Sequence, residues 1–341
     1  MRRRLRNVRT VNSLVKAYES GFEGVFADPE QEDKFNDQMQ WASAADAAHE
    51  FGIAESGKGK LTIPYKCIEM LWPEAMPGPA QRRGDCVSHS TKNAQLLTLA
   101  CEIVAGKPDE DTGIIEGPPA VSDVGERNGV LSTEAIYWWR DHGGDGWGCH
   151  HASRVAVNES GMWVRKDYRP DFGFDLTKYS ASLAGKWGRT SPPAAVKEFG
   201  LKHAIKQATS CGSFEELRDV LANGYGVSSC GGEGWSSRKD VYGFSKRSGS
   251  WSHAMAIIAV DDRQIAYDTW GEPVICILNS WGSGWNSGGR KIIGTNIEIP
   301  KGAFWSRWSD ARRRSFIALS GAEGWPPQKL PDWGSDYWSR L

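Results

Sequence analysis

Hydrophobic residues follow two different patterns along the chain, a helical spacing in the first half and short continuous runs in the second. A segment without Gly or Pro follows Cys86 and extends past Cys101, with apolar residues three to four positions apart. This spacing predicts an amphipathic helix. The residues expected on its buried face are Leu96, Leu97, Ala100, Ile103 and Val104.

The remaining elements follow the same division. Shorter helices are predicted over 132–140, 152–160 and 214–222, the second of them ending before Gly161. Later apolar runs rich in Ile and Val predict buried strands. These strands are expected over 224–229, 254–260, 274–278, 291–299 and 315–319. Helices that precede strands in this way predict an α+β protein with two segregated lobes.

The two ends of the chain differ from its centre. Residues 1–60 predict a helical extension, because apolar residues recur at helical spacing from Val8 to Tyr18, and Gly57 to Lys60 is typical of a linker. Residues 107–128 predict a polar loop. Four prolines before Gly84 predict an extended or turning chain; they are Pro64, Pro73, Pro77 and Pro79. The predicted division is an extension over 1–60, a main domain over 61–325 and a tail over 326–341.

The composition narrows the class of protein. Hydrophobic residues make up 40% and charged residues 24% of the 341 residues, which is typical of a globular protein and not of a disordered one. The formal net charge of −1 gives no overall basic field for nucleic acid. Five arginines among the first nine residues could contact nucleic acid or an acidic partner, but such runs are more often solvated termini.

Neither a membrane span nor a secretory signal is predicted. No stretch approaches the roughly 18 apolar residues that a spanning helix needs. The charged start is not followed by an apolar region, because Arg9, Asn12, Ser13 and Lys16 interrupt it. The expected location is the cytoplasm or a virion; the alternative is a mature chain whose leader was removed.

The seven cysteines do not form a pattern typical of a disulfide-rich domain. Their number is odd and no two are spaced as CxxC, so most are expected to be buried free thiols. Cys149, His150 and His151, with His142 nearby, could be interpreted as a metal cluster. They lack a second Cys or His pair at chelating spacing, so no metal and no cofactor is predicted.

Cys86 is the candidate nucleophile. It follows a loop that contains Gly84 and Asp85 and begins the predicted helix, where backbone N–H groups and the helix dipole favour an anion. The dipole alone contributes roughly 0.3–1 kcal/mol, so a nearby imidazole is also needed to activate the thiol.

His253 and Asn279 are the candidate partners of this thiol. His253 begins the predicted strand 254–260, and the strand 274–278 leads directly into Asn279. A carboxamide beside the ring can fix its orientation and tautomer without adding negative charge. His89, one turn after Cys86, is a competing base, but it is expected to point away on the same helix and to lack an orienting partner.

These segments resemble the papain-like (C1) cysteine peptidases. Ser252-His253-Ala254 and the run from Asn279 to Trp285, Asn-Ser-Trp-Gly-Ser-Gly-Trp, are similar to the family's histidine and asparagine blocks. Gly84-Asp85-Cys86 is similar to the nucleophile block and comes first, as the family order requires. Residues 142–147 and 163–168 resemble its glycine-rich subsite loop and a Tyr-containing turn. The resemblance covers roughly 63–319 and implies a papain-like fold, with the nucleophile helix in a helical lobe and His and Asn in an antiparallel β lobe.

The resemblance also implies roles for residues around the triad. Gln81 and the Cys86 backbone N–H would hold the oxyanion, and Gly143 and Gly144 would present backbone to an extended substrate. Ala254 would line the main specificity pocket, and Trp281 would shield the bond between Asn279 and His253 from water.

The nucleophile block departs from the family. Gln81 lies five residues before Cys86 where the family has six, and Val87-Ser88-His89 replaces the family's aromatic pattern. The second cysteine of the block is missing, and with it the family's usual disulfide there. The sequence is closer to divergent members from bacteria, phages or large viruses than to lysosomal enzymes.

The function implied is hydrolysis of peptide bonds through an acyl-thioester, with a peptide or protein as substrate. Two alternatives stay open: a non-catalytic peptide-binding or structural protein, for example of a virion, and a hydrolase of cell-wall peptides or isopeptides. The extension could inhibit the site or dock a partner. The sequence predicts no oligomeric state.

Overall fold

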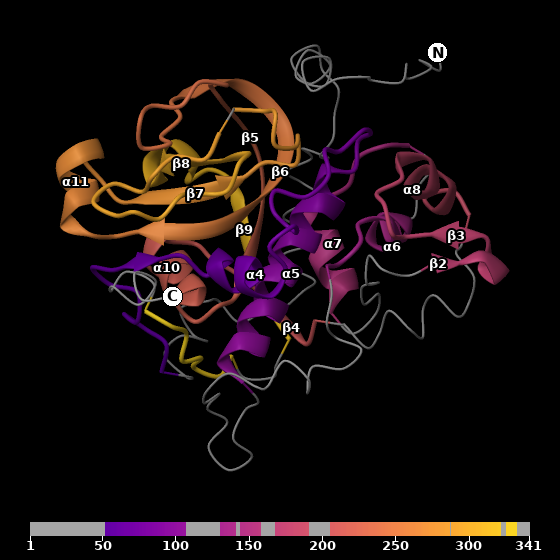
Figure 1. Cartoon of the computed structure of the whole chain (residues 1–341), viewed down its shortest axis with the longest axis horizontal. Helices are drawn as coiled ribbons and strands as arrows, with labels where there is room; N and C mark the ends of the chain where they lie inside the picture. Colours follow the sequence, from indigo (N-terminus) through magenta and orange to yellow (C-terminus); the bar gives the residue numbers. More distant parts are fainter. Residues whose placement is uncertain are drawn as a thin grey trace.

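The computed structural model describes residues 52–106, 130–140, 144–157, 168–190, 205–286, 288–321 and 325–332. Most of the predicted extension, over 1–51, and the predicted loop over 107–128 lie outside the described residues. The described chain forms a helical lobe, made of α4 to α8, and a β lobe built on one large sheet (Figure 1). The predicted α+β class is confirmed.

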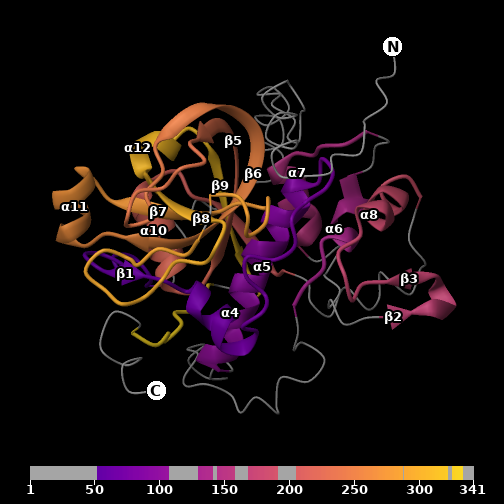
Figure 2. The same cartoon turned by 45° about the horizontal axis from the view of Figure 1, so that its top comes forward.

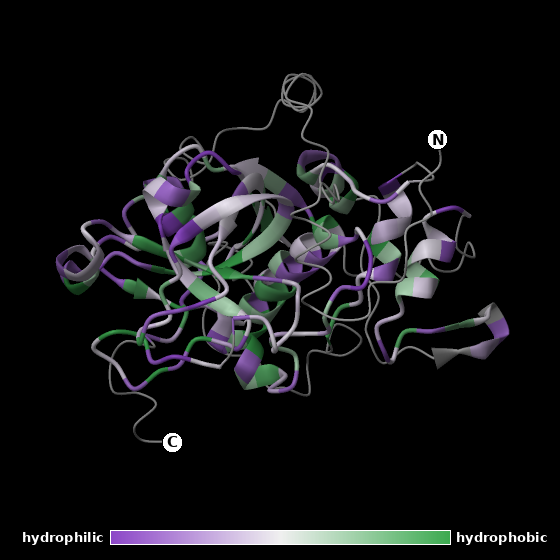
Figure 3. Cartoon of the chain, turned by 90° about the horizontal axis from the view of Figure 1, so that it is seen from above, coloured by the Kyte–Doolittle hydropathy of each residue, from purple (hydrophilic) through white to green (hydrophobic). Residues whose placement is uncertain are grey.

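The β lobe is an antiparallel sheet of seven strands in the order β4-β9-β5-β6-β7-β8, with β1 paired to β6. Strands of this lobe carry hydrophobic stretches (Figure 3). Strand β7 reads Val-Ile-Cys-Ile-Leu, and all its residues are buried. The strands span Leu61–Thr62 (β1), Gln207–Ser210 (β4), Gly226–Trp235 (β5), Arg247–Asp261 (β6), Val274–Leu278 (β7), Ala303–Arg307 (β8) and Ser315–Ser320 (β9). The helices of this lobe are α10 (Phe214–Ala222), α11 (Gln264–Trp270) and α12 (Trp308–Ala311).

Helix α5 (Cys86–Ala105) lies between the lobes and packs against β5, β6 and β9 (Figure 2). It begins at Cys86, as predicted. The five residues predicted to be buried are buried, but they do not form a separate face, because every residue of α5 except Glu102 is buried. The sheet, α4 and α7 surround the helix, so even its polar residues are enclosed.

The other elements of the helical lobe are short. They are α4 (Tyr65–Leu71), α6 (Glu134–Tyr137), η2 (Trp138–Arg140), α7 (Cys149–Ala156), β2 (Tyr168–Arg169), η3 (Pro170–Phe172), β3 (Phe174–Asp175) and α8 (Ala181–Trp187). β2 and β3 pair only with each other. Helices α6 and α7 overlap the predicted 132–140 and 152–160, although α7 begins three residues earlier and ends at Ala156.

Two expectations of local structure are wrong. Residues 65–71 form α4 where proline suggested an extended chain, because Pro64 occupies the N-cap and Tyr65 and Ile68 are buried one turn apart. Residues 291–299 form no strand but a single bridge between Lys291 and Glu298 around a tight turn. Gly294 adopts φ +70° in this turn.

The segment before β1 is tied to the β lobe. Asp219 of α10 accepts hydrogen bonds from the backbone N–H of Glu55 (2.8 Å) and of Gly57 (3.1 Å), and Asp262 accepts one from Gly59 (2.8 Å). Ile53 is buried. In the part of the chain that the structure describes, no helix has an apolar stretch long enough to cross a bilayer.

Candidate active site

His253 and Asn279 come from neighbouring strands. The expectation that His253 begins a strand is wrong, because β6 starts at Arg247 and its polar first residues pair with β5. His253 lies within β6, and Asn279 directly follows β7, which pairs with β6. The ring Nε2 and the Asn279 Oδ1 are 2.9 Å apart, and both residues are fully buried. Since the amide oxygen can only accept, Nε2 carries the hydrogen in this bond. The sequence prediction therefore placed these two residues side by side correctly.

Trp281 covers this pair. Its ring stacks on that of His253, with centroids 4.8 Å apart and planes at 24°. Trp251 and Trp285 pack against Trp281, with ring centroids 4.8 Å and 5.4 Å away. All three indoles are buried. The histidine thus sits against an aromatic layer that supplies little solvation to a charged ring.

Burial sets the protonation of His253. Loss of solvation lowers its pKa to about 3, the Asn279 hydrogen bond opposes this shift, and nearby Arg314 adds to it. The imidazole is therefore neutral at neutral pH and able to accept a proton.

Contacts between α5 and β5 place Cys86 at the same end of the lobe interface as the histidine. The Gly226 N–H donates to Thr98 Oγ1 (2.9 Å), and Ser90 Oγ lies 2.7 Å from Ser228 Oγ. The strand therefore runs antiparallel to the helix, and Cys86 comes one helical turn before Ser90.

This register brings the start of α5 level with Cys230 and Gly231 of β5. Gly231 pairs with His253, and Cys230 pairs with Ala254. Cys86 is not disulfide-bonded and is fully buried. The predicted nucleophile, base and orienting amide thus gather around one end of α5.

Gln81 joins the asparagine segment to the nucleophile loop. Its backbone N–H donates to the Ser280 carbonyl (2.8 Å), its side-chain oxygen accepts from Ser280 Oγ, and its Nε2 donates to the Arg83 carbonyl (3.0 Å). The side chain is fully buried. Both the oxygen and the nitrogen of the Gln81 side-chain amide are therefore held in place beside the site.

The predicted glycine-rich loop lies against the nucleophile loop. The Gly146 N–H donates to the Gly84 carbonyl (2.9 Å), and a Cβ on Gly84 would come within 2.7 Å of the Asp145 Cβ. Gly84 is therefore required by this close approach. Gly144 is exposed on this loop, whereas Gly143 lies outside the described residues.

A second group of buried polar residues adjoins Cys86 in the helical lobe. Tyr179 donates to Asp85 Oδ2 (2.6 Å), and His89 Nε2 lies 3.7 Å from the same oxygen. The Asp85 carboxyl therefore lies near the His89 ring, at a distance beyond that of a hydrogen bond. The His89 ring packs edge-on against that of Tyr179, with centroids 5.0 Å apart. Burial raises the pKa of Asp85 to about 7, and Tyr179 and then Arg83 oppose this shift.

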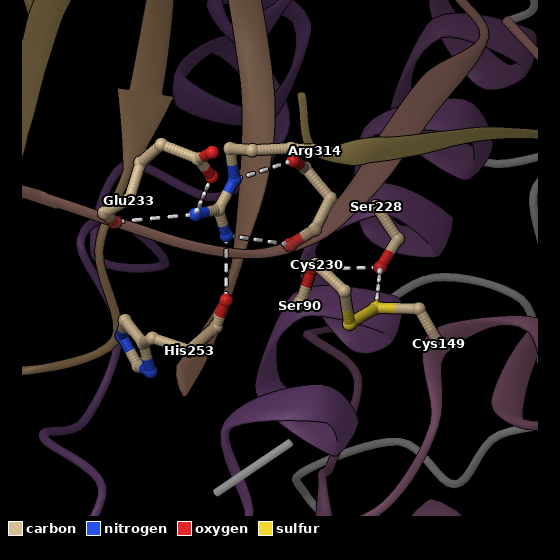
Figure 4. The surroundings of a disulfide bond; sticks show 8 residues. Ser90, Cys149, Ser228, Cys230, Glu233, His253 and Arg314 are labelled. Carbon is tan, nitrogen blue, oxygen red and sulfur yellow. Dashed lines mark hydrogen bonds and ion pairs between the residues drawn. A yellow bond between two sulfur atoms is a disulfide. The ribbon is translucent and has the colours of Figure 1, made fainter. Parts of the chain in front are cut away.

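One disulfide joins the lobes next to this site. Cys149, at the start of α7, is bonded to Cys230 of β5 (Figure 4). Cys149 is therefore not a thiolate ligand for a metal while the bond is intact. The other five described cysteines form no disulfide and are buried, as expected for most of the cysteines; they are Cys67, Cys86, Cys101, Cys211 and Cys276.

Sequence reasoning missed three features of the site: the Cys149–Cys230 bond, the Asp85–Tyr179 contact and the buried Arg314. Their partners are 61 to 94 positions apart in the chain. Only Asp85 carried a local signal, since an acidic residue directly before a nucleophilic cysteine works against its thiolate.

No protein-family model and no curated protein matches the sequence. Among solved structures, the chain is similar to xylellain, a cysteine protease from Xylella fastidiosa, at 15% identity over 72% of this chain and 82% of that one, with a TM-score of 0.44. It is also similar to digestive procathepsin L2 from the Tenebrio molitor larval midgut, at 12% identity over 92% and 83%, with a TM-score of 0.45. Procathepsin B S9 from Trypanosoma congolense matches at 12% identity over 76% of each chain, with a TM-score of 0.40. None of these values is high enough to assign a function to this chain.

Proposed function

We propose that this chain is a cysteine peptidase that hydrolyses peptide bonds through Cys86, His253 and Asn279. The observation that carries the proposal is the buried 2.9 Å bond between His253 and Asn279, set at the end of the lobe interface where Cys86 begins α5. An oriented base beside a cysteine at a helix start is the arrangement that activates a thiol.

The reaction follows from the two ring nitrogens of His253. Nε2 is bonded to Asn279, so Nδ1 takes the proton of the Cys86 thiol as Sγ attacks the substrate carbonyl. The ring then gives this proton to the leaving amine, and an acyl-thioester remains on Cys86. Water, deprotonated by the same ring, attacks the thioester and releases the acid.

Two donors would stabilise the oxyanion of the tetrahedral intermediate. One is the backbone N–H of Cys86 at the start of α5, and the other is the Gln81 carboxamide. The Gln81 Nε2 also donates to the Arg83 carbonyl, which fixes the orientation of the carboxamide. Trp281, stacked on the ring, would keep water from the bond between His253 and Asn279.

The substrate would lie along the glycine-rich loop. Gly144, exposed beside the nucleophile loop, and Gly143 would offer backbone groups to an extended peptide without a side chain in the way. Ala254, adjacent to the histidine and paired with Cys230, would line the pocket for the specificity-determining side chain.

Mass spectrometry after treatment with a thiol-directed reagent tests the proposal. The chain is reacted with iodoacetamide or a papain-family epoxide at pH 6, and each cysteine is quantified. We expect Cys86 to be modified far faster than the other four free cysteines. They are a matched internal control because all are buried like Cys86, and burial raises the pKa of the thiols of Cys101, Cys211 and Cys276.

The variant Cys86→Ala should lose both the labelling and any peptide cleavage while it stays folded. A folded wild-type chain whose Cys86 reacts no faster than free cysteine would reject the proposal and favour a peptide-binding role on the same scaffold. Cleavage of cell-wall peptides or isopeptides, but not of ordinary peptides, would redirect the substrate class and retain the chemistry.

A further inference from the structure

Arg314 is a buried cation directly behind the candidate histidine. It precedes β9, and its side chain is fully enclosed. Its Nη2 donates to the backbone carbonyl of His253 (2.5 Å) and to that of Ser229 (3.3 Å), and its Nε donates to Ser229 Oγ (2.9 Å). A guanidinium therefore ties β5 to β6 at the residue that carries the imidazole (Figure 4).

The strand β5 is shaped to admit this side chain. A Cβ on Gly231 would come within 2.6 Å of the Arg314 Cγ and within 2.7 Å of Glu233 Oε2. Gly231 is also the residue that pairs with His253. A side chain at position 231 would therefore clash with that of Arg314. The glycine makes room for the buried cation beside the histidine.

The charge of Arg314 is only partly balanced. Its one carboxylate partner among the described residues is Glu233, at 3.6 Å from Nη1, and Nη1 also donates to the Glu233 backbone carbonyl (3.3 Å). The guanidinium lies over the Trp235 ring at 5.4 Å. Burial lowers the pKa of Arg314 to about 10, while Glu233 and Cys86 raise it, so the group is charged at neutral pH.

Both members of the candidate dyad respond to this cation. Arg314 lowers the pKa of His253, and negative charge on Cys86 raises the pKa of Arg314. Such coupling is reciprocal, so the cation favours the thiolate and disfavours the imidazolium.

We propose that Arg314 is a positioning residue for Cys86 and His253. It holds the backbone of His253, and its positive charge favours loss of the proton from both side chains. The proposal rests on the proposed function. The charged and titratable groups facing Arg314 are Glu233 from β5, His253 from β6 and Cys86 from α5; Asp85 and His89 adjoin Cys86 on its far side.

The test is the pH profile of Cys86 alkylation by iodoacetamide, followed by mass spectrometry. A thiol coupled to an imidazole loses its protons in two steps, and each step has an apparent pKa that belongs to the pair. Removal of a cation raises both. We expect Arg314→Gln to move both steps to higher pH by about one unit.

Two further variants separate charge from structure. Arg314→Lys keeps the cation but not its fork of donors, so both steps should stay in place while the rate falls. Glu233→Gln leaves Arg314 without its carboxylate, so both steps should move to lower pH. Arg218→Gln is the matched control, because Arg218 is a buried arginine bound to Asp219 and Asp262 in another part of the β lobe; it should leave the profile unchanged.

The outcomes distinguish the two proposals. If the wild-type profile has the single step of an ordinary thiol, the proposed function fails. If the wild type shows two steps but Arg314→Gln and Glu233→Gln leave them in place, the role of Arg314 is overturned. If Arg314→Gln does not fold, the shift of both steps to lower pH in Glu233→Gln, beside unchanged steps in Arg314→Lys, still decides.

Discussion

The two sides of Cys86 hold buried ionisable groups in different ways. On the β side, His253 is held by the Asn279 side chain and, through its carbonyl, by Arg314. The elements involved are strands whose register fixes the backbone. On the helical side, Asp85 is held by a hydroxyl from Tyr179, which reaches it from 94 positions away.

Burial moves the two groups in opposite directions. It lowers the pKa of His253 to about 3 and raises that of Asp85 to about 7. Both shifts favour the neutral form of the group, an uncharged imidazole on one side and a protonated carboxyl on the other. The comparison teaches that an acid next to the proposed nucleophile is tolerated because the fold suppresses its charge.

The largest expected effect distinguishes the two histidines. His253→Ala should lower the rate of peptide hydrolysis by roughly 10²–10⁴-fold, because it removes the proton acceptor and donor of the reaction. His89→Gln should leave the rate near that of the wild type, because the His89 ring packs against Tyr179 of the helical lobe. Both rates are measured on one peptide substrate, with folding verified by circular dichroism. Equal losses in the two variants would mean that the base has been misassigned.

The opposite pKa shifts predict opposite pH dependences of stability. Asp85 binds its proton more tightly when folded, so its contribution to the free energy of unfolding is complete below about pH 4 and is lost as the pH rises to about 7. His253 binds its proton less tightly when folded, so its contribution is complete above about pH 6.5 and is lost as the pH falls to about 3.

Variants should separate these two contributions. Asp85→Asn leaves only the contribution of His253, so the free energy of unfolding should rise from pH 4 to pH 7 relative to the wild type. His253→Gln leaves only the contribution of Asp85, so the free energy of unfolding should fall over the same range relative to the wild type. Each relative change is expected to be roughly 2–4 kcal/mol, measured by urea unfolding at several pH values. Parallel curves for the wild type and both variants would contradict the burial argument.

The disulfide that joins the two sides should contribute to stability more than to chemistry. Cys149 and Cys230 are 81 positions apart, and loss of a cross-link over such a loop costs about 2–4 kcal/mol of unfolding free energy. A double alanine variant should show this loss. A reductant should destabilise the wild type to a similar extent and leave the double variant unchanged. An equal response of both proteins to reductant would mean that the bond does not form.

The sequence predicted the elements whose buried residues follow a simple apolar spacing along the chain. The helix 214–222 and the strand 274–278 occur with the predicted bounds, because apolar spacing alone determines them. The strand 254–260 is part of a longer one, since the polar start of β6 is paired with β5 and not selected by hydrophobicity. The segment 291–299 was misassigned because Gly294 turns the chain back within it.

The candidate site divides in the same way. His253 and Asn279 could be found because each stands next to an apolar run. Arg314 could not, because its partners are backbone carbonyls that only the folded sheet brings together. The boundary at residue 60 stays a prediction. Because residues 55–59 bind Asp219 and Asp262, a truncation that tests inhibition by the extension should begin at Gly52; equal rates with and without residues 1–51 would dismiss that role.

The smallest expected effect compares the two orienting hydrogen bonds. Asn279→Ala removes a buried bond that fixes the ring of His253, which is worth about 1–3 kcal/mol, so the rate should fall roughly tenfold to a hundredfold. Tyr179→Phe removes the bond to Asp85, which takes no part in proton transfer; this variant should raise the pKa of Asp85 further and leave the rate almost unchanged. Peptide hydrolysis at pH 6 measures both. If Tyr179→Phe lowers the rate of hydrolysis as much as Asn279→Ala does, Asp85 and Tyr179 also position the proposed nucleophile. The contrast between the two sides of Cys86 would then be wrong.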